Sequence, residues 1–156
     1  MRRIILSNIT CQSAGSPLIC SLLTGIPQHP IEDLKLNNVM IFHQGGGTSE
    51  DAARQLPEKE KDYPEPNMFG ATSAHGFFVR HVRGLEMESI KIEHSNQDAR
   101  PVFVLTDVQR VDFERIKAPS AAGVPTFVLN DVRDFNVSGS KPVPDIDLET
   151  VDHKQL

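Results

Sequence analysis

VDFERI, at residues 111–116, places apolar side chains at its first, third and sixth positions, with polar residues between them. Three other segments repeat the whole pattern, and a further one repeats its first half. They are Ile4–Ile9, Leu34–Val39, Leu85–Ile90 and, in part, Phe135–Gly139. In the complete segments a polar pair precedes the last apolar position, which interrupts the alternation of a strand and predicts a bend. The starting positions indicate a period of about 25 residues with two insertions.

A second row of strand-like segments precedes three of these repeats. It is rich in aromatic and β-branched residues, which favour strands, and it comprises Phe77–Val82, Val102–Val108 and Thr126–Val132. No run of about 10 residues shows a helical period. A repeat this short cannot bury its own apolar face, so neighbouring repeats must stack. The sequence therefore predicts an all-β right-handed parallel β-helix (a solenoid) of about six coils. A leucine-rich repeat has a similar period, but its regular consensus is absent.

We expect one domain, with coils over residues 1–140, a loop insertion at 44–75 and a C-terminal cap or tail at 141–156. The insertion interrupts the periodicity and contains Gly45–Gly47, the charged run Glu58–Asp62 and several prolines. Long excursions from a compact repeat are usually functional or disordered. The insertion is therefore the first place to look for a site.

The N-terminal end of the predicted stack is unusual. Its first repeat strand begins at Ile4 with no polar capping unit before it, and an uncovered strand edge invites pairing with another chain. Either further coils belong before this strand, or another element covers it. We expect the chain to self-associate or to pair through this edge.

Composition excludes several classes of protein. The 156 residues carry a net charge of −5 and contain no Trp, so no basic surface indicates nucleic acid as a partner. No stretch approaches the ~20 apolar residues of a membrane span, so we expect no membrane partner. The basic and then apolar segment Met1–Ser7 is too short for a signal peptide. The six histidines lack zinc-site spacing, so neither a metal nor a cofactor is expected. Cys11 and Cys20 form either a disulfide or, as we favour, two buried thiols.

Several segments resemble the C-terminal third of bacterial glycoside hydrolase family 28 proteins, the polygalacturonase-like enzymes. The resemblance extends over about residues 3–140, and its most specific block is YPEPNMFG at residues 63–70. The other segments that carry it are His29–Val39, Gln44–Thr48, Pro57–Asp62, His75–Leu85 and Asp98–Leu105. The family fold is a right-handed parallel β-helix, and its members act on galacturonan or rhamnogalacturonan, which makes a pectic saccharide the implied partner. They are typically periplasmic or secreted, whereas this chain shows no signal peptide.

The resemblance also implies that this chain lacks the catalytic residues of the family. Family members invert the anomeric centre with aspartates in an ordered series of Asn-x-Asp, Asp-Asp, Gly-His-Gly and Arg-x-Lys motifs, because inversion needs a separate acid and base. This chain has no Asp-Asp and no Gly-His-Gly. Asn96–Asp98 and Arg115–Lys117 match the outer motifs but are too close together, and Arg115–Lys117 aligns with the end of another repeat strand, Ser89–Lys91. We interpret both as coincidences and expect no catalytic residue in this chain.

Three aligned positions offer another carboxylate constellation. His81, Asp107 and Asp131 occupy one column of the repeat alignment, so they would stack ~4.8 Å apart. Asp107 and Asp131 would then form a retaining glycosidase pair. Alternatively, as we favour, each caps a turn just before a strand-closing valine by accepting a backbone N–H two residues on. The next column contains Arg83, Gln109 and Arg133. Its arginines would either bind uronate carboxylates or form a solvated face.

We predict five substrate-binding residues on or beside the insertion. Tyr63 and Phe69 would stack on sugar rings, Glu65 and His75 would hydrogen-bond hydroxyl groups, and Arg80 would bind a carboxylate. The alternative is that Tyr63, Met68 and Phe69 pack onto the sheet and hold the loop.

Three functions follow from these patterns. The first is the C-terminal part of a pectin-acting glycoside hydrolase that is inactive alone. The second is a non-catalytic carbohydrate-binding or subunit-pairing module. The third is a small hydrolase that uses Asp107 and Asp131. We favour the first.

Overall fold

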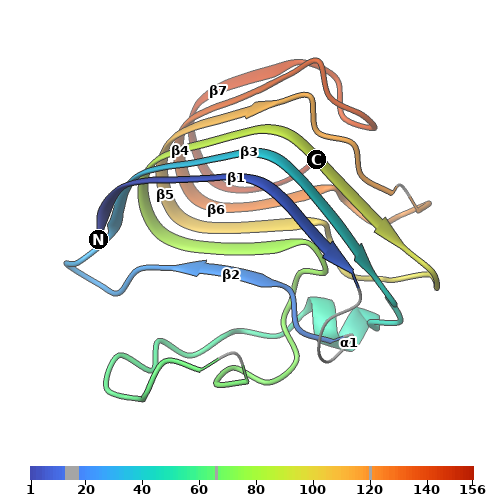
Figure 1. Cartoon of the computed structure of the whole chain (residues 1–156), viewed down its shortest axis with the longest axis horizontal. Helices are drawn as coiled ribbons and strands as arrows, with labels where there is room; N and C mark the ends of the chain where they lie inside the picture. Colours follow the sequence, from blue (N-terminus) through green and yellow to red (C-terminus); the bar gives the residue numbers. More distant parts are fainter. Residues whose placement is uncertain (13–17, 66, 120) are drawn as a thin grey trace.

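The computed structural model describes residues 1–12, 18–65, 67–119 and 121–156, and it confirms an all-β protein. Pro66, within the block that carries the family resemblance, lies outside the described residues. In the described part, one sheet holds seven strands and one short helix accompanies it (Figure 1). The elements are β1 (Arg2–Gln12), β2 (Ser21–Thr24), β3 (Ile31–His43), α1 (Ser49–Ala52), β4 (Phe77–His94), β5 (Phe103–Glu114), β6 (Phe127–Ser138) and β7 (Ile146–Gln155).

The strand order is β1-β3-β4-β5-β6-β7, and β2 pairs with the beginning of β4. All pairs are parallel except β6 with β7, which is antiparallel. The register aligns the repeats as the sequence predicts, since equivalent apolar positions are partners on successive strands. They run Ile4, Leu34, Leu85, Val111 and Phe135. Five segments far apart in the chain thus share one face of the sheet.

Left-handed residues interrupt the strands at equivalent positions. The second member of each polar pair has a positive φ, as expected for a bend: Asn8, Asn38, Ser89 and Arg115 lie between 53° and 58°. His81, Asp107 and Asp131 form another such column, at 53°, 52° and 48°. Figure 1 shows β4, β5 and β6 bending along their length. Asp107 and Asp131 therefore lie at bends, but inside β5 and β6. The carboxylate of Asp107 binds His81 and Arg83, which differs from the expected cap on a backbone N–H.

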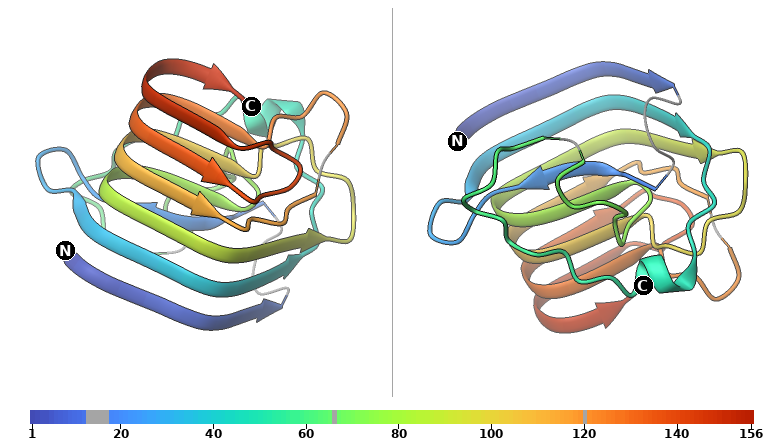
Figure 2. Two further views of the ribbon diagram at one scale, coloured as in Figure 1. Left: turned by 90° about the horizontal axis from the view of Figure 1, so that it is seen from above. Right: turned by 90° about the horizontal axis from the view of Figure 1, so that it is seen from below.

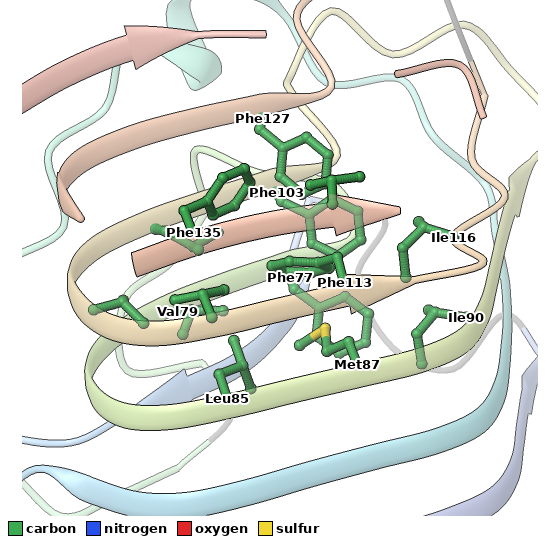
Figure 3. Close-up of a cluster of buried hydrophobic side chains, with 14 of the residues drawn as sticks. Phe77, Val79, Leu85, Met87, Ile90, Phe103, Phe113, Ile116, Phe127 and Phe135 are labelled. Atoms are coloured by element: carbon green, nitrogen blue, oxygen red, sulfur yellow. The ribbon is translucent and has the colours of Figure 1, made fainter. Parts of the chain in front are cut away.

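The core is built from columns of identical or similar apolar side chains. Phe103 lies between Phe77 and Phe127, with ring centroids 5.7 and 4.8 Å away and nearly parallel planes. Phe113 meets Phe103 and Phe127 edge to face (Figure 3). Offset stacked and edge-to-face pairs are favourable aromatic geometries. The parallel register therefore turns a sequence repeat into a continuous aromatic stack.

A second, smaller cluster covers the other face at the beginning of β4 and β5. It consists of Cys20, Ala74, Phe78 and Val104, packed against Leu22, Leu56 and Val128. We call residues 44–76, which connect β3 to β4, the excursion. Through Leu56 and Ala74, parts of the excursion pack against this face.

The two ends of the sheet differ. Antiparallel β7 lies beside β6, whereas in the described residues β1 pairs only with β3 (Figure 2). Leu6 and Ile9 of β1 are each 38% exposed, although their partners Leu36 and Val39 are 3% and 4% exposed. The apolar column therefore continues to the β1 end without a cover.

Both cysteines are free, as favoured over a disulfide: Cys20 is buried and Cys11 is partly buried. Burial raises the pKa of the Cys20 thiol to about 11. Cys20 therefore acts as a small apolar residue beneath the excursion.

Candidate functional site

A groove of about 490 Å³ lies between the excursion and the sheet. One wall is α1 and the residues after it, from Ser49 to Glu58, and the opposite wall includes His153 and Gln155 of β7. The floor combines two neighbouring columns of the repeat, one apolar and one polar. The apolar column is Phe78, Val104 and Val128, and the polar column is Arg80, Thr106 and Asn130. The floor therefore offers an apolar stripe beside a row of hydrogen-bonding groups.

Arg80 connects the floor to the excursion wall. It is 4% exposed, and its two terminal nitrogens donate to the carbonyl oxygens of Leu56 and Pro57 at 2.8 and 3.0 Å. Its guanidinium is also 3.2 Å from Glu58 and lies over the rings of Phe69 and Phe78. Burial lowers the pKa of Arg80, and Glu58 partly offsets this effect. These contacts fix the wall over the sheet.

Arg80 keeps one polar atom without a protein partner. Its buried Nε finds no hydrogen-bond acceptor among the described residues. An unsatisfied buried donor is costly.

A chain of charged groups continues from Glu58. His81 lies between two carboxylates, with Nε2 3.2 Å from Glu58 and Nδ1 2.6 Å from Asp107. Arg83 donates to the other oxygen of Asp107 at 2.7 Å. Burial raises the pKa of Asp107, but the hydrogen bonds from His81 and Arg83 outweigh it and leave that pKa below its usual range. Asp107 is thus held ionised at the bend.

Three histidine rings meet at the root of the excursion. His43 ends β3, His94 ends β4, and His75 lies two residues before β4 begins. Their centroids are 5.1 to 5.7 Å apart, and Nε2 of His43 lies 3.1 Å from Nδ1 of His75. Among the described residues, no group of His, Cys, Asp or Glu has the arrangement needed to hold a metal ion.

Beside these rings lies a buried ion pair. Asp98 and Arg100 are joined by hydrogen bonds of 2.7 and 2.9 Å, and both side chains are fully buried. Asp98 also accepts the N–H of Gly47, and Arg100 donates to carbonyl oxygens of Leu18 and Thr72. The pair therefore ties the excursion to the sheet.

The five predicted substrate-binding residues do not converge on one place. Tyr63 is 85% exposed, and Glu65 is also exposed at the outer part of the excursion. Phe69 is partly buried against Arg80, and His75 is buried among the other histidines. Only Arg80 lines the groove. Of the predicted hydrophobic clamp, Met68 and Phe69 are partly buried, whereas Tyr63 extends into solvent.

The remaining sequence motifs lie in structural positions. Asp98 of Asn96–Asp98 belongs to the buried ion pair. Lys117 forms an isolated bridge with Lys91, so Arg115–Lys117 aligns with Ser89–Lys91 as expected, although β5 itself ends at Glu114. Of the predicted arginine column, Arg83 binds Asp107, and Arg133 lies 3.8 Å from Asp131. Asp107 and Asp131 thus each have an arginine partner.

Sequence reasoning missed the groove wall and the histidine cluster. Thr48 and Asp51 form a capping box that begins α1, and this Thr-x-x-Asp pattern is readable in the sequence. His43 and His94 are register partners at the ends of adjacent repeat strands, so the alignment carries that signal too. The position of His75 depends on the path of the excursion, which the repeat does not encode.

Comparison with family models, curated proteins and solved structures found no match to this chain. In the described residues, no helix has the length and apolar character to cross a membrane. Function must therefore be argued from the groove, the edges of the sheet and the residues themselves.

Proposed function

We propose that this chain is the C-terminal part of a right-handed parallel β-helix protein that acts on pectic polysaccharides, and that it contributes no catalytic acid of its own. The uncovered β1 edge carries this proposal. Core-facing Leu6 and Ile9 lie exposed on β1, directly in register with buried Leu36 and Val39. A preceding strand in the same parallel register would bury both and pair the free backbone edge of β1.

The regular register supports the solenoid form of this proposal. Equivalent residues of β3 to β6 are partners, and left-handed residues recur at equivalent bends. Each repeat therefore follows the same path as its neighbour, as the coils of a solenoid do.

The pKa of Asp107 and the ion pairs of Asp107 and Asp131 support the proposal that this chain is inactive alone. A glycosidase acid needs a raised pKa so that it is protonated when it meets the leaving oxygen. Asp107 has a lowered pKa and is engaged by His81 and Arg83, while Asp131 lies beside Arg133. Asp107 is therefore unsuited to be the acid in the alternative of a small hydrolase built on these two aspartates.

This proposal is tested by reading the coding sequence that precedes Met1 and by assaying hydrolysis. The coding sequence that precedes Met1 should contain Asp-Asp and Gly-His-Gly motifs in one reading frame, and the longer chain should cleave polygalacturonate. Residues 1–156 alone should give no reducing ends above a buffer blank. Hydrolysis by the short chain that disappears in Asp107→Asn would overturn the proposal.

The groove favours a second candidate function, carbohydrate binding without catalysis. Sugars present apolar faces edged by hydroxyl groups, and the floor pairs the apolar side chains of Phe78 and Val104 with the polar groups of Thr106 and Asn130.

This function is tested by titrating the chain with oligogalacturonides while recording amide chemical shifts. The largest shifts should fall on residues 49–58 and on Asn130, and Asn130→Ala should weaken binding about tenfold, as loss of a hydrogen bond to a charged ligand does. The matched control is Asn136→Ala, which lies outside this groove. Shifts confined to the exposed segment around Tyr63 would contradict binding in the groove.

A further inference from the structure

The contact between His43 and His75 fixes where the protons on both rings lie. The N–H of Gly45 donates to Nδ1 of His43 at 3.1 Å, so this nitrogen carries no proton. A neutral His43 must then carry its proton on Nε2, 3.1 Å from Nδ1 of His75. Nδ1 of His75 therefore accepts, and His75 is protonated on Nε2.

This hydrogen-bond chain exists only while both rings are neutral. A second proton on His43 would occupy Nδ1 and break the bond from Gly45. A second proton on His75 would occupy its Nδ1 and face the N–H of His43. Either event replaces a hydrogen bond by two opposed donors.

The surroundings offer little compensation for an added charge. His75 is 5% exposed. Burial is the main cause that lowers its pKa to about 3, with smaller contributions from His43, His94 and Arg100, and Asp98 opposes the shift. Burial also lowers the pKa of His43, with His94 adding to the effect. Asp98 is already engaged by Arg100 and by the N–H of Gly47, so it is not free to accept from a protonated ring.

We propose that His43 and His75 form an acid-sensitive latch that holds the root of the excursion, residues 44–48 and 72–76, against the sheet. The latch lies where the excursion leaves β3 and where it rejoins β4. The wall of the groove, beginning at Ser49 of α1, directly follows the first of these segments. Opening the latch therefore acts on the segment from which the groove wall begins. This inference depends on the histidine geometry and not on which ligand the groove binds.

The direction of the pH response follows from linkage. In an open root both rings are solvated and regain an ordinary pKa near 6.5, so the open form binds more protons than the closed form below that pH. The latch is fully closed above about pH 6.5 and weakens as the pH falls toward about 3, where His75 itself is protonated in the closed form. Between about pH 7.5 and 5.0, His75 alone raises the open-to-closed ratio by about thirty-fold.

Amide hydrogen exchange measures this ratio, after correction for the intrinsic pH dependence of exchange. The amides of Gly45 and Gly46 and of His75 should lose protection by about thirty-fold or more between these pH values. Amides of the β5 core, such as Val108, should keep their protection, which separates a local opening from global unfolding. Equal loss at all these sites would overturn the proposal.

Variants assign the effect to the two rings. His75→Asn keeps an acceptor at the position of Nδ1 but cannot be protonated, so it should remove most of the acid response, and His43→Asn/His75→Asn should remove it. The matched control His29→Asn, in an exposed turn, should respond like the unaltered chain. An undiminished response in the double variant, or its loss in His94→Asn alone, would contradict the assignment.

A measurement on the unaltered chain does not depend on any variant folding. Long-range ¹H–¹⁵N spectra at about pH 7.5 distinguish the two neutral tautomers of histidine. Both His43 and His75 should appear as the form protonated on Nε2. A charged ring, or a proton on Nδ1 of either residue, would exclude the hydrogen-bond chain on which the latch depends.

Discussion

Asp98 and Arg100 are the most fully buried charges in the described part of the chain, with no exposed side-chain surface on either. A buried ion pair has an uncertain net value, but removing one partner leaves an uncompensated charge. This pair also binds Gly47 and the carbonyl oxygen of Thr72. A single residue here therefore affects both the sheet and the excursion.

Arg100→Met should lower the free energy of unfolding by about 3–5 kcal/mol, because it leaves Asp98 buried without its cation. Urea denaturation measures this loss. The matched control is Arg54→Met, whose side chain is 55% exposed beside Asp51, and it should change stability by less than about 1 kcal/mol. Equal losses in the two variants would contradict the role given to burial.

The Asp98–Arg100 pair should also cause a loss of folding stability at acid pH, which is distinct from the opening of the latch. Burial raises the pKa of Asp98, but hydrogen bonds from Arg100 outweigh it and hold that pKa well below its usual range. Its contribution is therefore present above the unfolded-state pKa near 4 and is lost as the pH falls below that value. In Arg100→Met this loss below about pH 4 should be absent from the urea-derived stability profile. A profile parallel to that of the unaltered chain would assign the acid limb to other groups.

At the scale of the strand, the repeat specifies contacts between residues far apart in the chain. Each phenylalanine of the Phe77, Phe103 and Phe127 column packs on the next because the strands are parallel and in register. The central ring contacts a phenylalanine on both sides. Phe103 is therefore the position in this column where loss of the ring should destabilise the protein most.

Phe103→Ala should lower the free energy of unfolding by about 3–5 kcal/mol, because it removes a fully buried ring and leaves a cavity between two others. Phe42→Ala, at the exposed end of β3, is the control and should cost far less. Thermal and urea unfolding measure both variants. Comparable losses would mean that the aromatic stack contributes nothing beyond surface apolar contacts.

The left-handed bends give a prediction about backbone shape. Asn38 has a φ of 53°, and its side chain donates to Asn8 on the next strand. Asn38→Val should destabilise the protein by about 1–2 kcal/mol because a β-branched residue disfavours this conformation. Asn38→Gly loses the same side-chain bond without the strain, so it should be less destabilising when both are compared by urea denaturation. The reverse order would argue against a strained bend.

Much of the strand arrangement could be predicted because each repeat has the same spacing of apolar and polar residues. The apolar spacing placed Leu34, Leu85 and Val111 in one column, and the polar pairs located the bends at Asn38 and Ser89. The excursion has no such repeat. Its path depends on single long-range contacts, such as Arg80 with Leu56, and these contacts have no local sequence signal. For that reason the sequence did not reveal that Tyr63 and Glu65 lie exposed, away from the groove that Arg80 lines.

At the scale of the whole molecule, the predicted tail at residues 141–156 contains β7, whose direction the sequence did not reveal. The alternation of apolar residues through Ile146, Leu148 and Val151 fits a strand facing β6, but neither parallel nor antiparallel pairing follows from alternation alone. The open β1 edge, by contrast, follows from the first repeat segment itself.

The β1 edge should make the chain self-associate at micromolar concentration, because it presents unpaired backbone beside exposed Leu6 and Ile9. Sedimentation velocity over a range of concentrations measures this. Leu6→Asp/Ile9→Asp should sediment as a monomer with an unchanged circular dichroism spectrum, while Thr150→Asp on β7 should behave like the unaltered chain. A monomer at all concentrations in the unaltered chain would show that the edge is not adhesive.

The difference between the two terminal strands limits how large any such assembly grows. β7 presents Asp147, Glu149 and Asp152 to solvent, and charges on an edge strand discourage further pairing. Two copies that join β1 to β1 use the adhesive edge of both, and each then turns a charged strand outward. Assembly of this kind stops at a closed pair with twofold symmetry. Fibre growth, the usual hazard of stacked strands, would require β7 to pair as well, and the charges on β7 disfavour this.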